Sequence, residues 1–318
     1  MVDSNQTDQN ATEANNTTGL QFPCAVAVPD VLLIIIGSLA VLLNGLLLLL
    51  IANNRKIFLR TRVSFLVANL SLADFLTGAM LVLVIMLRLM QSRDIFKGFQ
   101  FFFLCTSIQI SFLTLLLMSL DRVVVATLPL TWSRLLTRRR TVFAIAVVWA
   151  LSIFGGIMIQ YHTKKKRLAM LLFQEISVCL FTASHVFIFQ FLKRQRRRLV
   201  YLIRWSALEL SALVDMPLQA SHAQITSVVL TLMLVLIVTY LPYIIRLNML
   251  MATKSTDIPV QQFDTVFRYT QAFSYLNFAV NPIIYAWRLK VYRRAFCKMF
   301  GFSTMSRRRR RSHFIQRI

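Results

Sequence analysis

Seven long apolar stretches constrain this chain more than any other feature of its sequence. The hydrocarbon core of a bilayer is about 30 Å thick, so a helix needs roughly 20 mostly apolar residues to cross it. Seven segments meet this requirement, at approximately 30–52, 63–88, 98–126, 141–160, 169–192, 223–251 and 264–287. The sequence therefore predicts an all-α membrane protein built as a seven-transmembrane helix bundle over residues 30–287.

Composition supports the same fold class. With 57% hydrophobic and 15% charged residues, the 318-residue chain is too apolar for a soluble domain of its size. The formal net charge of +24 would suit a nucleic-acid partner, but the cations lie between the apolar stretches and form no reading face. We therefore expect membrane lipids, and no nucleic acid, among the partners.

The distribution of cations predicts the orientation. Residues 1–29 contain no Lys or Arg and carry four glycosylation sequons, at Asn5, Asn10, Asn15 and Asn16. With this tail outside, 26 of the 36 cations fall on the cytoplasmic side, where Lys and Arg are retained. We expect a multi-pass protein of the plasma membrane with a glycosylated, extracellular N-terminal tail.

The segment after the last apolar stretch combines aromatic and basic residues in "WRLKVYRRAFCKMF". This pattern predicts an amphipathic eighth helix on the inner membrane surface over 288–301. Cys297 within it is either a lipidation site or an ordinary buried thiol. The remaining residues 302–318 form a basic cytoplasmic tail, and "RRRRR" at 307–311 is expected to contact anionic lipids.

Strongly polar residues fall at about the same depth in four of the apolar stretches. They are Asn44, Asp74, Ser111, Asn277 and Asn281. Such residues are costly in lipid and usually face the bundle interior. A carboxylate among amides and a hydroxyl suits a small hard cation, or a proton with ordered water. The alternative is that these groups hydrogen-bond one another and hold helices together.

Helical phase places a charged pair at the inner end of the third stretch. Ser111 and Arg122 are separated by about three helical turns, so they share a face. That face reads Leu104, Ile108, Ser111, Leu115, Met118 and Arg122. Arg122 therefore points into the bundle, with Asp121 as its nearest neutralising charge. Pro242 and Pro282 each remove a backbone hydrogen bond and are expected to bend the sixth and seventh helices.

These features together resemble the rhodopsin-like (class A) family of G-protein-coupled receptors. The similarity extends from residue 30 to 300 and is carried by "LLNGLLL", "NLSLADFL", "SLDRVVVATLPL", Trp149, Pro242 and "NPIIY". It implies a receptor that passes an extracellular ligand signal to heterotrimeric G proteins. A transporter or channel, with Asp74 as the ion or proton site, is the alternative. No catalytic constellation is visible, and we expect no enzymatic activity.

The resemblance implies roles for individual residues. Arg122, beside Asp121, is expected to become available to a Gα subunit when the sixth helix swings outward about Pro242. Leu130 would offer the G protein a hydrophobic contact, and Tyr285 would turn inward on activation. Asp74, Ser111, Asn277 and Asn281 match the family's allosteric sodium site, and no other cofactor is expected.

The sequence also departs from the family pattern. Lys97 stands where a disulfide-forming cysteine is usual, the fifth helix has no proline, and Tyr240 replaces a tryptophan before Pro242. These departures, with a short second outer loop, are similar to the melanocortin and lysophospholipid receptor branch. His222 stands where an acid often holds the family's arginine. Since histidine cannot accept a salt bridge from Arg122, we predict a weakened inactive state and ligand-independent signalling.

The ligand is less constrained than the mechanism. Leu104 stands where amine receptors carry an aspartate, which argues against a monoamine. The candidate pocket residues are Gln100, Leu104, Cys105, Ile108, Glu175, Tyr243, Arg246, Gln271 and Tyr275. Cations including Arg88 and Arg268 surround the expected mouth; they either attract an anionic lipid or acidic peptide, or anchor the helices at the membrane interface. Glu175 is either a ligand contact or the partner of a nearby cation.

Overall fold

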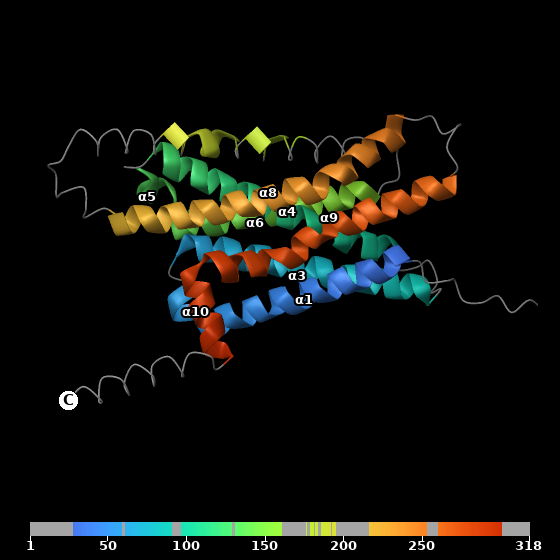
Figure 1. Cartoon of the computed structure of the whole chain (residues 1–318), viewed down its shortest axis with the longest axis horizontal. Coiled ribbons are helices and arrows are strands. Elements are labelled where there is room, and N and C mark those ends of the chain that lie inside the picture. Colours follow the sequence, from blue (N-terminus) through green and yellow to red (C-terminus); the bar gives the residue numbers. More distant parts are fainter. Residues whose placement is uncertain are drawn as a thin grey trace, which may run out of the picture.

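The computed structural model describes residues 28–58, 61–90, 97–128, 131–160, 216–252 and 260–300, with scattered positions between 176 and 194. Within these residues all regular secondary structure is helical. The long helices lie side by side along one axis (Figure 1). They are α1 (Val28–Asn53), α3 (Arg62–Leu89), α4 (Lys97–Thr127), α6 (Arg138–Gln160), α8 (Met216–Ala252) and α9 (Val260–Arg288).

Five of these helices, namely α1, α3, α4, α6 and α8, are long and apolar enough to cross a membrane, counted over the described part of the chain. α9 has 29 residues but is more polar. The boundaries agree with the expected spans to within four residues, except that α8 begins at Met216 instead of 223. Of the span expected at 169–192, only scattered positions are described, among which 186–191 are helical.

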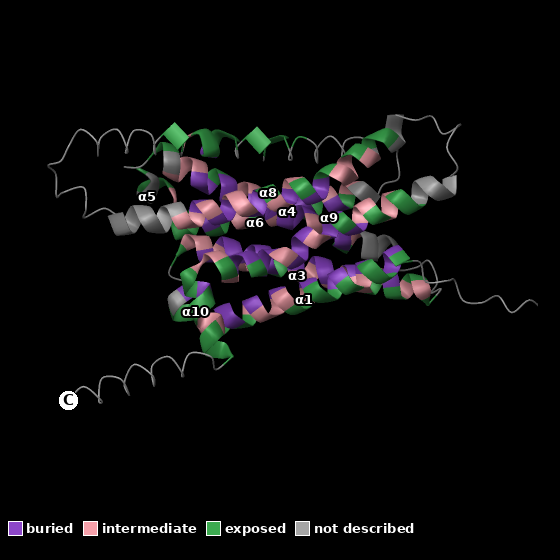
Figure 2. Cartoon of the chain, in the orientation of Figure 1, coloured by how far each residue is buried: buried purple, intermediate pink, exposed green. Residues whose placement is uncertain are grey.

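Glycines set the closest helix approaches. A Cβ atom at Gly78 of α3 would lie 2.7 Å from the carbonyl oxygen of Gly37 in α1, so both positions need a residue without a side chain. Gly155 and Gly156 of α6 pack in the same way against side chains of α4. Small residues at these contacts let the backbones approach, as is common between membrane helices. The buried faces point inward, while the outer faces are exposed (Figure 2).

A chain of two hydrogen bonds joins the helices α3, α4 and α6. Trp149 Nε1 of α6 donates to Asn69 Oδ1 of α3 at 2.9 Å, and Asn69 Nδ2 donates to Thr114 Oγ1 of α4 at 2.7 Å. Each of these groups would be costly in lipid without a partner. This part of the polar inventory therefore serves helix packing.

Three further short helices have described boundaries: α2 (Arg55–Phe58), α5 (Trp132–Leu135) and α10 (Lys290–Met299). Leu289 has an extended backbone, so α10 turns away from the axis of α9 (Figure 1). Its buried Tyr292 packs on Phe58 and Tyr285, with ring centroids 4.6 and 6.0 Å apart. α10 thus occupies the segment where the amphipathic helix was predicted, and its exposed Cys297 is a free thiol.

Candidate functional site

The polar residues predicted to share one depth meet in the bundle core. Asp74 is fully buried and accepts hydrogen bonds from Ser111 Oγ at 2.5 Å and from Asn281 Nδ2 at 2.6 Å. These three residues come from α3, α4 and α9. Asn277 is also buried, one turn before Asn281 on the same helix. The structure therefore brings together three of the four residues expected to hold a sodium ion and places the fourth beside them.

Several oxygens and nitrogens in this region lack a partner within the described residues. They are both side-chain polar atoms of Asn277, Asn281 Oδ1, Asn44 Oδ1, Ser71 Oγ and the Tyr285 hydroxyl. Buried polar groups without partners are rare and usually indicate ordered water or an ion. The donors in this region are carboxylate, amide and hydroxyl oxygens, which suit a hard cation better than a transition metal.

The Asn44 side chain binds backbone carbonyl groups, whereas the sequence grouped it with the polar side chains around Asp74. Its Nδ2 donates to the carbonyl oxygens of Ala40 at 2.9 Å and Phe278 at 2.8 Å. Phe278 lies four residues before Pro282, so the proline removes the amide that would normally bond to this carbonyl. Asn44 therefore compensates for the proline in α9 and fixes α1 to it.

Arg122 is buried at the inner end of α4, as its helical phase predicts, with 1% of its side chain exposed. Its Nε donates to Asp121 Oδ2 at 2.9 Å, and Nη2 is also bonded to this oxygen. Nη1 is buried without a partner in the described part of the chain. The guanidinium thus has an incomplete set of acceptors.

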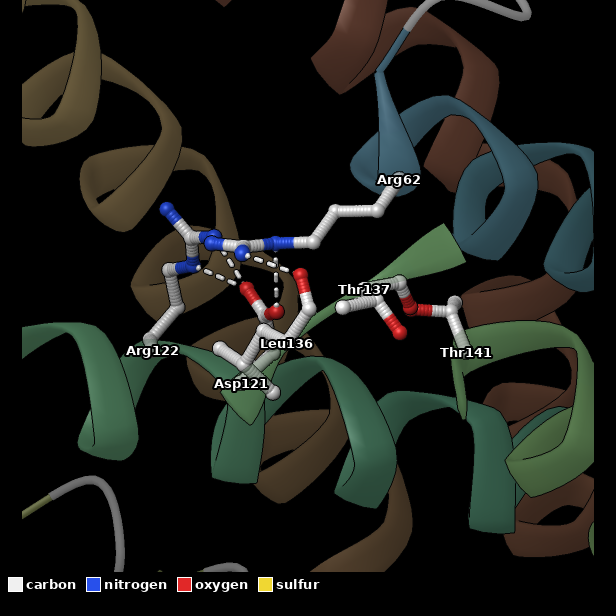
Figure 3. A network of polar contacts seen from close by, with 6 residues as sticks. All are labelled: Arg62, Asp121, Arg122, Leu136, Thr137 and Thr141. Carbon is white, nitrogen blue, oxygen red and sulfur yellow. Dashed lines mark hydrogen bonds and ion pairs between the residues drawn. The ribbon is translucent and has the colours of Figure 1, made fainter. Parts of the chain in front are cut away.

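Asp121 has a second partner. Arg62, the first residue of α3, places its Nε 3.0 Å from Asp121 Oδ1. Its Nη1 donates at 3.0 Å to the carbonyl oxygen of Leu136, between α5 and α6. Figure 3 shows the two guanidinium groups approaching the carboxylate from different helices. Asp121 is thus the nearest neutralising charge of Arg122, and the same carboxylate is shared with Arg62.

The inner end of α8 is fastened to α9. Gln224 Nε2 donates to the carbonyl oxygen of Arg288 at 2.7 Å. This carbonyl belongs to the last residue of α9, where helix carbonyls have no intrahelical amide partner. His222 lies two residues earlier in α8, but its side chain is outside the described residues.

Aromatic residues dominate the outer half of the core. Tyr240 packs edge to face on Phe112 with centroids 4.8 Å apart, and Tyr243 lies 5.4 Å from Tyr240 and 5.5 Å from Phe267. Of the predicted pocket residues, Cys105 and Tyr275 lie near Tyr240 and Tyr243, and Gln271 lies beside Tyr275. Leu104 is buried in the same core, and Ile108 packs against it. Arg246 is half-buried further along α8.

A buried aspartate engages two cations of the predicted mouth. Asp30 of α1 lies 3.5 Å from Arg88 Nη1 of α3 and 3.5 Å from Arg268 Nη1 of α9. Arg88 remains 57% exposed, whereas Arg268 is 18% exposed. These two arginines therefore help to hold three helices together at their outer ends, and the trio keeps a net charge of +1.

Some predicted residues cannot be placed. Asn5, Asn10, Asn15, Asn16, Leu130 and Glu175 lie outside the described residues, and so does the side chain of Gln100. Conversely, sequence reasoning missed Arg62, Gln224 and Asp30. Arg62 and Asp30 carried a signal, since each is a charged residue at the end of an apolar stretch. Gln224 carried none beyond its position.

Comparison with known proteins adds independent information. A family model described as "7 transmembrane receptor (rhodopsin family)" matches residues 43–285. Cannabinoid receptor 1 of Xenopus laevis is 26% identical over 301 residues, covering 87% of this chain and 64% of that receptor. Melanopsin of Podarcis siculus is 32% identical over 146 residues, covering 42% of this chain and 30% of melanopsin. The chain thus spans less than two thirds of the length of either relative.

The fold has a counterpart among solved structures. Squid rhodopsin superposes with a TM-score of 0.70 at 16% sequence identity, covering 87% of this chain and 86% of that one. This match and the family model confirm the predicted all-helical seven-transmembrane bundle with an eighth helix. They favour a receptor over a transporter, a channel or an enzyme. Since the family model covers most of the chain, the protein belongs to the rhodopsin family of seven-transmembrane receptors.

Proposed function

We propose that this receptor couples an extracellular ligand to heterotrimeric G proteins. The observation that supports this best is Arg122, buried at the inner end of α4 with Nη1 lacking an acceptor in the described residues. A buried charge with few partners favours release if another acceptor becomes available. In this proposal, an outward swing of the inner half of α8 about Pro242 exposes Arg122 to a Gα subunit.

The contacts on α8 and α9 fit such a movement. The swing breaks the Gln224 hydrogen bond to Arg288, a polar link between the inner ends of these helices. Tyr285 is buried with its hydroxyl unpaired in the described region, so a turn toward Arg122 would give it a partner. Tyr240 relays movement of the outer half to Phe112, the neighbour of Ser111. Leu130 offers a hydrophobic contact to the G protein.

A sodium ion is the proposed regulator of the same movement. Asp74, Ser111, Asn277 and Asn281 would hold it, and the unpaired atoms of Asn277 and Asn281 supply the oxygens that a hard cation needs. A bound cation would neutralise Asp74 and join α3, α4 and α9. The bound ion would then favour the closed arrangement, in which α3, α4 and α9 are close together.

For the ligand we propose a lipid-like molecule that enters between the aromatic residues of the outer core. Tyr240, Tyr243 and Phe267 form a continuous aromatic surface, and Gln271 and Tyr275 supply polar groups beside it. The similarity to a cannabinoid receptor agrees with this class. Because Asp30 engages Arg88 and Arg268, an anionic headgroup or acidic peptide would meet a weaker positive field than the sequence alone suggests.

The cellular setting is also a proposal. We place the receptor in the plasma membrane with residues 1–29 outside and glycosylated, and residues 302–318 in the cytoplasm. Exposed Cys297 on α10 is accessible to lipidation, and the cations of α10 and the tail suit anionic lipids of the inner leaflet. We also propose a relationship to the melanocortin and lysophospholipid receptor branch. It is supported by Lys97 in place of the usual cysteine and by the absence of a proline from the fifth helix.

The decisive experiment compares the wild type with Arg122→Ala in cells that carry reporters for several Gα classes. Candidate lipids and peptides are applied, and each signal is divided by the number of receptors at the surface. We expect at least one reporter to respond in the wild type and none in the variant. Equal signals from both receptors with every reporter would contradict the coupling role of Arg122.

A further inference from the structure

The carboxylate of Asp121 gives one oxygen to each of two arginines. Oδ2 accepts from Arg122 Nε at 2.9 Å, and Oδ1 lies 3.0 Å from Arg62 Nε (Figure 3). The three side chains are 1%, 6% and 10% exposed for Arg122, Asp121 and Arg62. A buried group of two cations and one anion carries a net charge of +1, so the two arginines compete for the same partner.

This sharing matters when Arg122 moves. If Asp121 had Arg122 as its single partner, exposing Arg122 to a G protein would leave a buried carboxylate unpaired, which is strongly unfavourable. With Arg62 in place, Asp121 remains paired after Arg122 departs. Arg62 therefore lowers the cost of the open arrangement and weakens the hold on Arg122 in the closed one.

Arg62 is anchored independently of Arg122. Its Nη1 donates to the Leu136 carbonyl at 3.0 Å, and its backbone begins α3. Neither contact involves α8, the helix that moves in the proposed function. Arg62 thus stays beside Asp121 while Arg122 changes partner.

The nearby Arg140 does not share this arrangement. It lines the same small cavity as Asp121, but its Nη1 donates to the carbonyl oxygens of Arg134 at 3.3 Å and Leu135 at 3.1 Å. Arg140 is exposed, whereas Arg62 is largely buried. It therefore offers a matched control: a neighbouring arginine that also donates to backbone carbonyls before α6, in this case those of α5.

We propose that Arg62 is a positioning residue for activation: it keeps Asp121 paired so that Arg122 can leave it for the G protein. This inference rests on the proposed coupling function. It assigns opposite effects to Asp121 and Arg62: Asp121 restrains Arg122, whereas Arg62 weakens that restraint. Removing Arg62 should therefore favour the closed arrangement.

The test uses the full-length receptor with recruitment of a minimal Gα subunit, measured per receptor at the cell surface without ligand. Arg62→Gln should lower recruitment at least about tenfold, because it both tightens the Asp121 contact with Arg122 and leaves Asp121 unpaired after release. Arg62→Lys, which keeps the charge, should retain most of the signal. Arg140→Gln should stay within about twofold of the wild type, because Arg140 donates to carbonyl oxygens of α5 and not to Asp121.

A second arm separates this role from a structural one. In an Asp121→Asn background there is no buried carboxylate to keep paired, so adding Arg62→Gln should leave recruitment per receptor unchanged. The double variant also decides the matter if Arg62→Gln alone fails to reach the surface, since it has no carboxylate at position 121 that could lose its partner. A further fall in the double variant, or an equal fall in Arg62→Gln and Arg140→Gln, overturns the proposal.

Different results would refute the coupling function and the role of Arg62. If Arg122→Ala recruits as much Gα as the wild type, the coupling function itself is wrong. If Arg122→Ala abolishes recruitment while Arg62→Gln leaves it at the wild-type value, coupling stands and the role of Arg62 is refuted.

Discussion

The hydrogen bond from Gln224 to Arg288 gives a direct test of what keeps α8 closed. Its 2.7 Å length and its position between two helices mean that it exists only while their inner ends are close together. In the open arrangement, water can serve both groups. Gln224→Leu keeps a side chain of similar size but removes the donor.

The expected magnitude follows from the nature of this bond. A hydrogen bond between neutral groups contributes a net of about 1 kcal/mol, which corresponds to roughly a fivefold change in the ratio of open to closed receptor. If the open fraction is small, basal output rises by the same factor. We therefore expect Gln224→Leu to increase ligand-independent signalling about fivefold per surface receptor.

The measurement is basal second-messenger output across a range of expression levels, with receptor number taken from an N-terminal epitope. Thr231→Val is a matched control, because Thr231 also lies in α8 but donates to the carbonyl of Ser227 in its own helix at 2.8 Å. It removes a hydrogen bond without loosening α8 from α9. The reasoning fails if Gln224→Leu gives no more basal output than Thr231→Val.

Three further predictions concern other parts of the structure. His222→Glu should lower basal output at least about fivefold by offering an acceptor to Arg122, whereas His222→Gln should not; equal output from both would reject a missing acid as the cause of basal signalling. Replacing potassium by sodium at constant ionic strength should raise the melting temperature of the purified wild type but not of Asp74→Asn; a shift of the same size in both would place the ion elsewhere. Gly156→Ala should reduce stability by about 1–3 kcal/mol, because its Cβ would overlap Thr106 and Phe102 of α4, and thermal unfolding that matches the wild type would show that α6 can shift at little cost.

The sequence predicted the helices well because each is encoded locally. An apolar run of sufficient length determines a membrane helix by itself, and the boundaries of α1, α3 and α4 lie within two residues of those expected. The early start of α8 was missed because it continues through polar residues after Met216, where hydropathy gives no signal.

The candidate site was predictable only in part, for a geometric reason. Helical period shows which residues of one helix share a face, and this was enough to place Ser111 and Arg122 on the interior of α4. It does not show how two helices are rotated against each other. Arg62 with Asp121, Gln224 with Arg288, and Asp30 with Arg268 all join different helices or distant segments, so these pairs emerged only from the structure.

The same pairs explain why high basal activity is a reasonable expectation for this receptor. Arg122 is held from within its own helix by a neighbouring carboxylate, and that carboxylate is shared with Arg62. Such a contact does not resist movement of α8, since both partners lie on α4. Among the described contacts of α8, Gln224 supplies a hydrogen bond between neutral groups to the end of α9. A salt bridge from α8 to Arg122 would contribute more than this bond, because hydrogen bonds to charged groups are stronger than neutral ones. We therefore expect the closed and open receptor to differ little in free energy, so that a ligand in the outer core needs to supply little energy to change their balance.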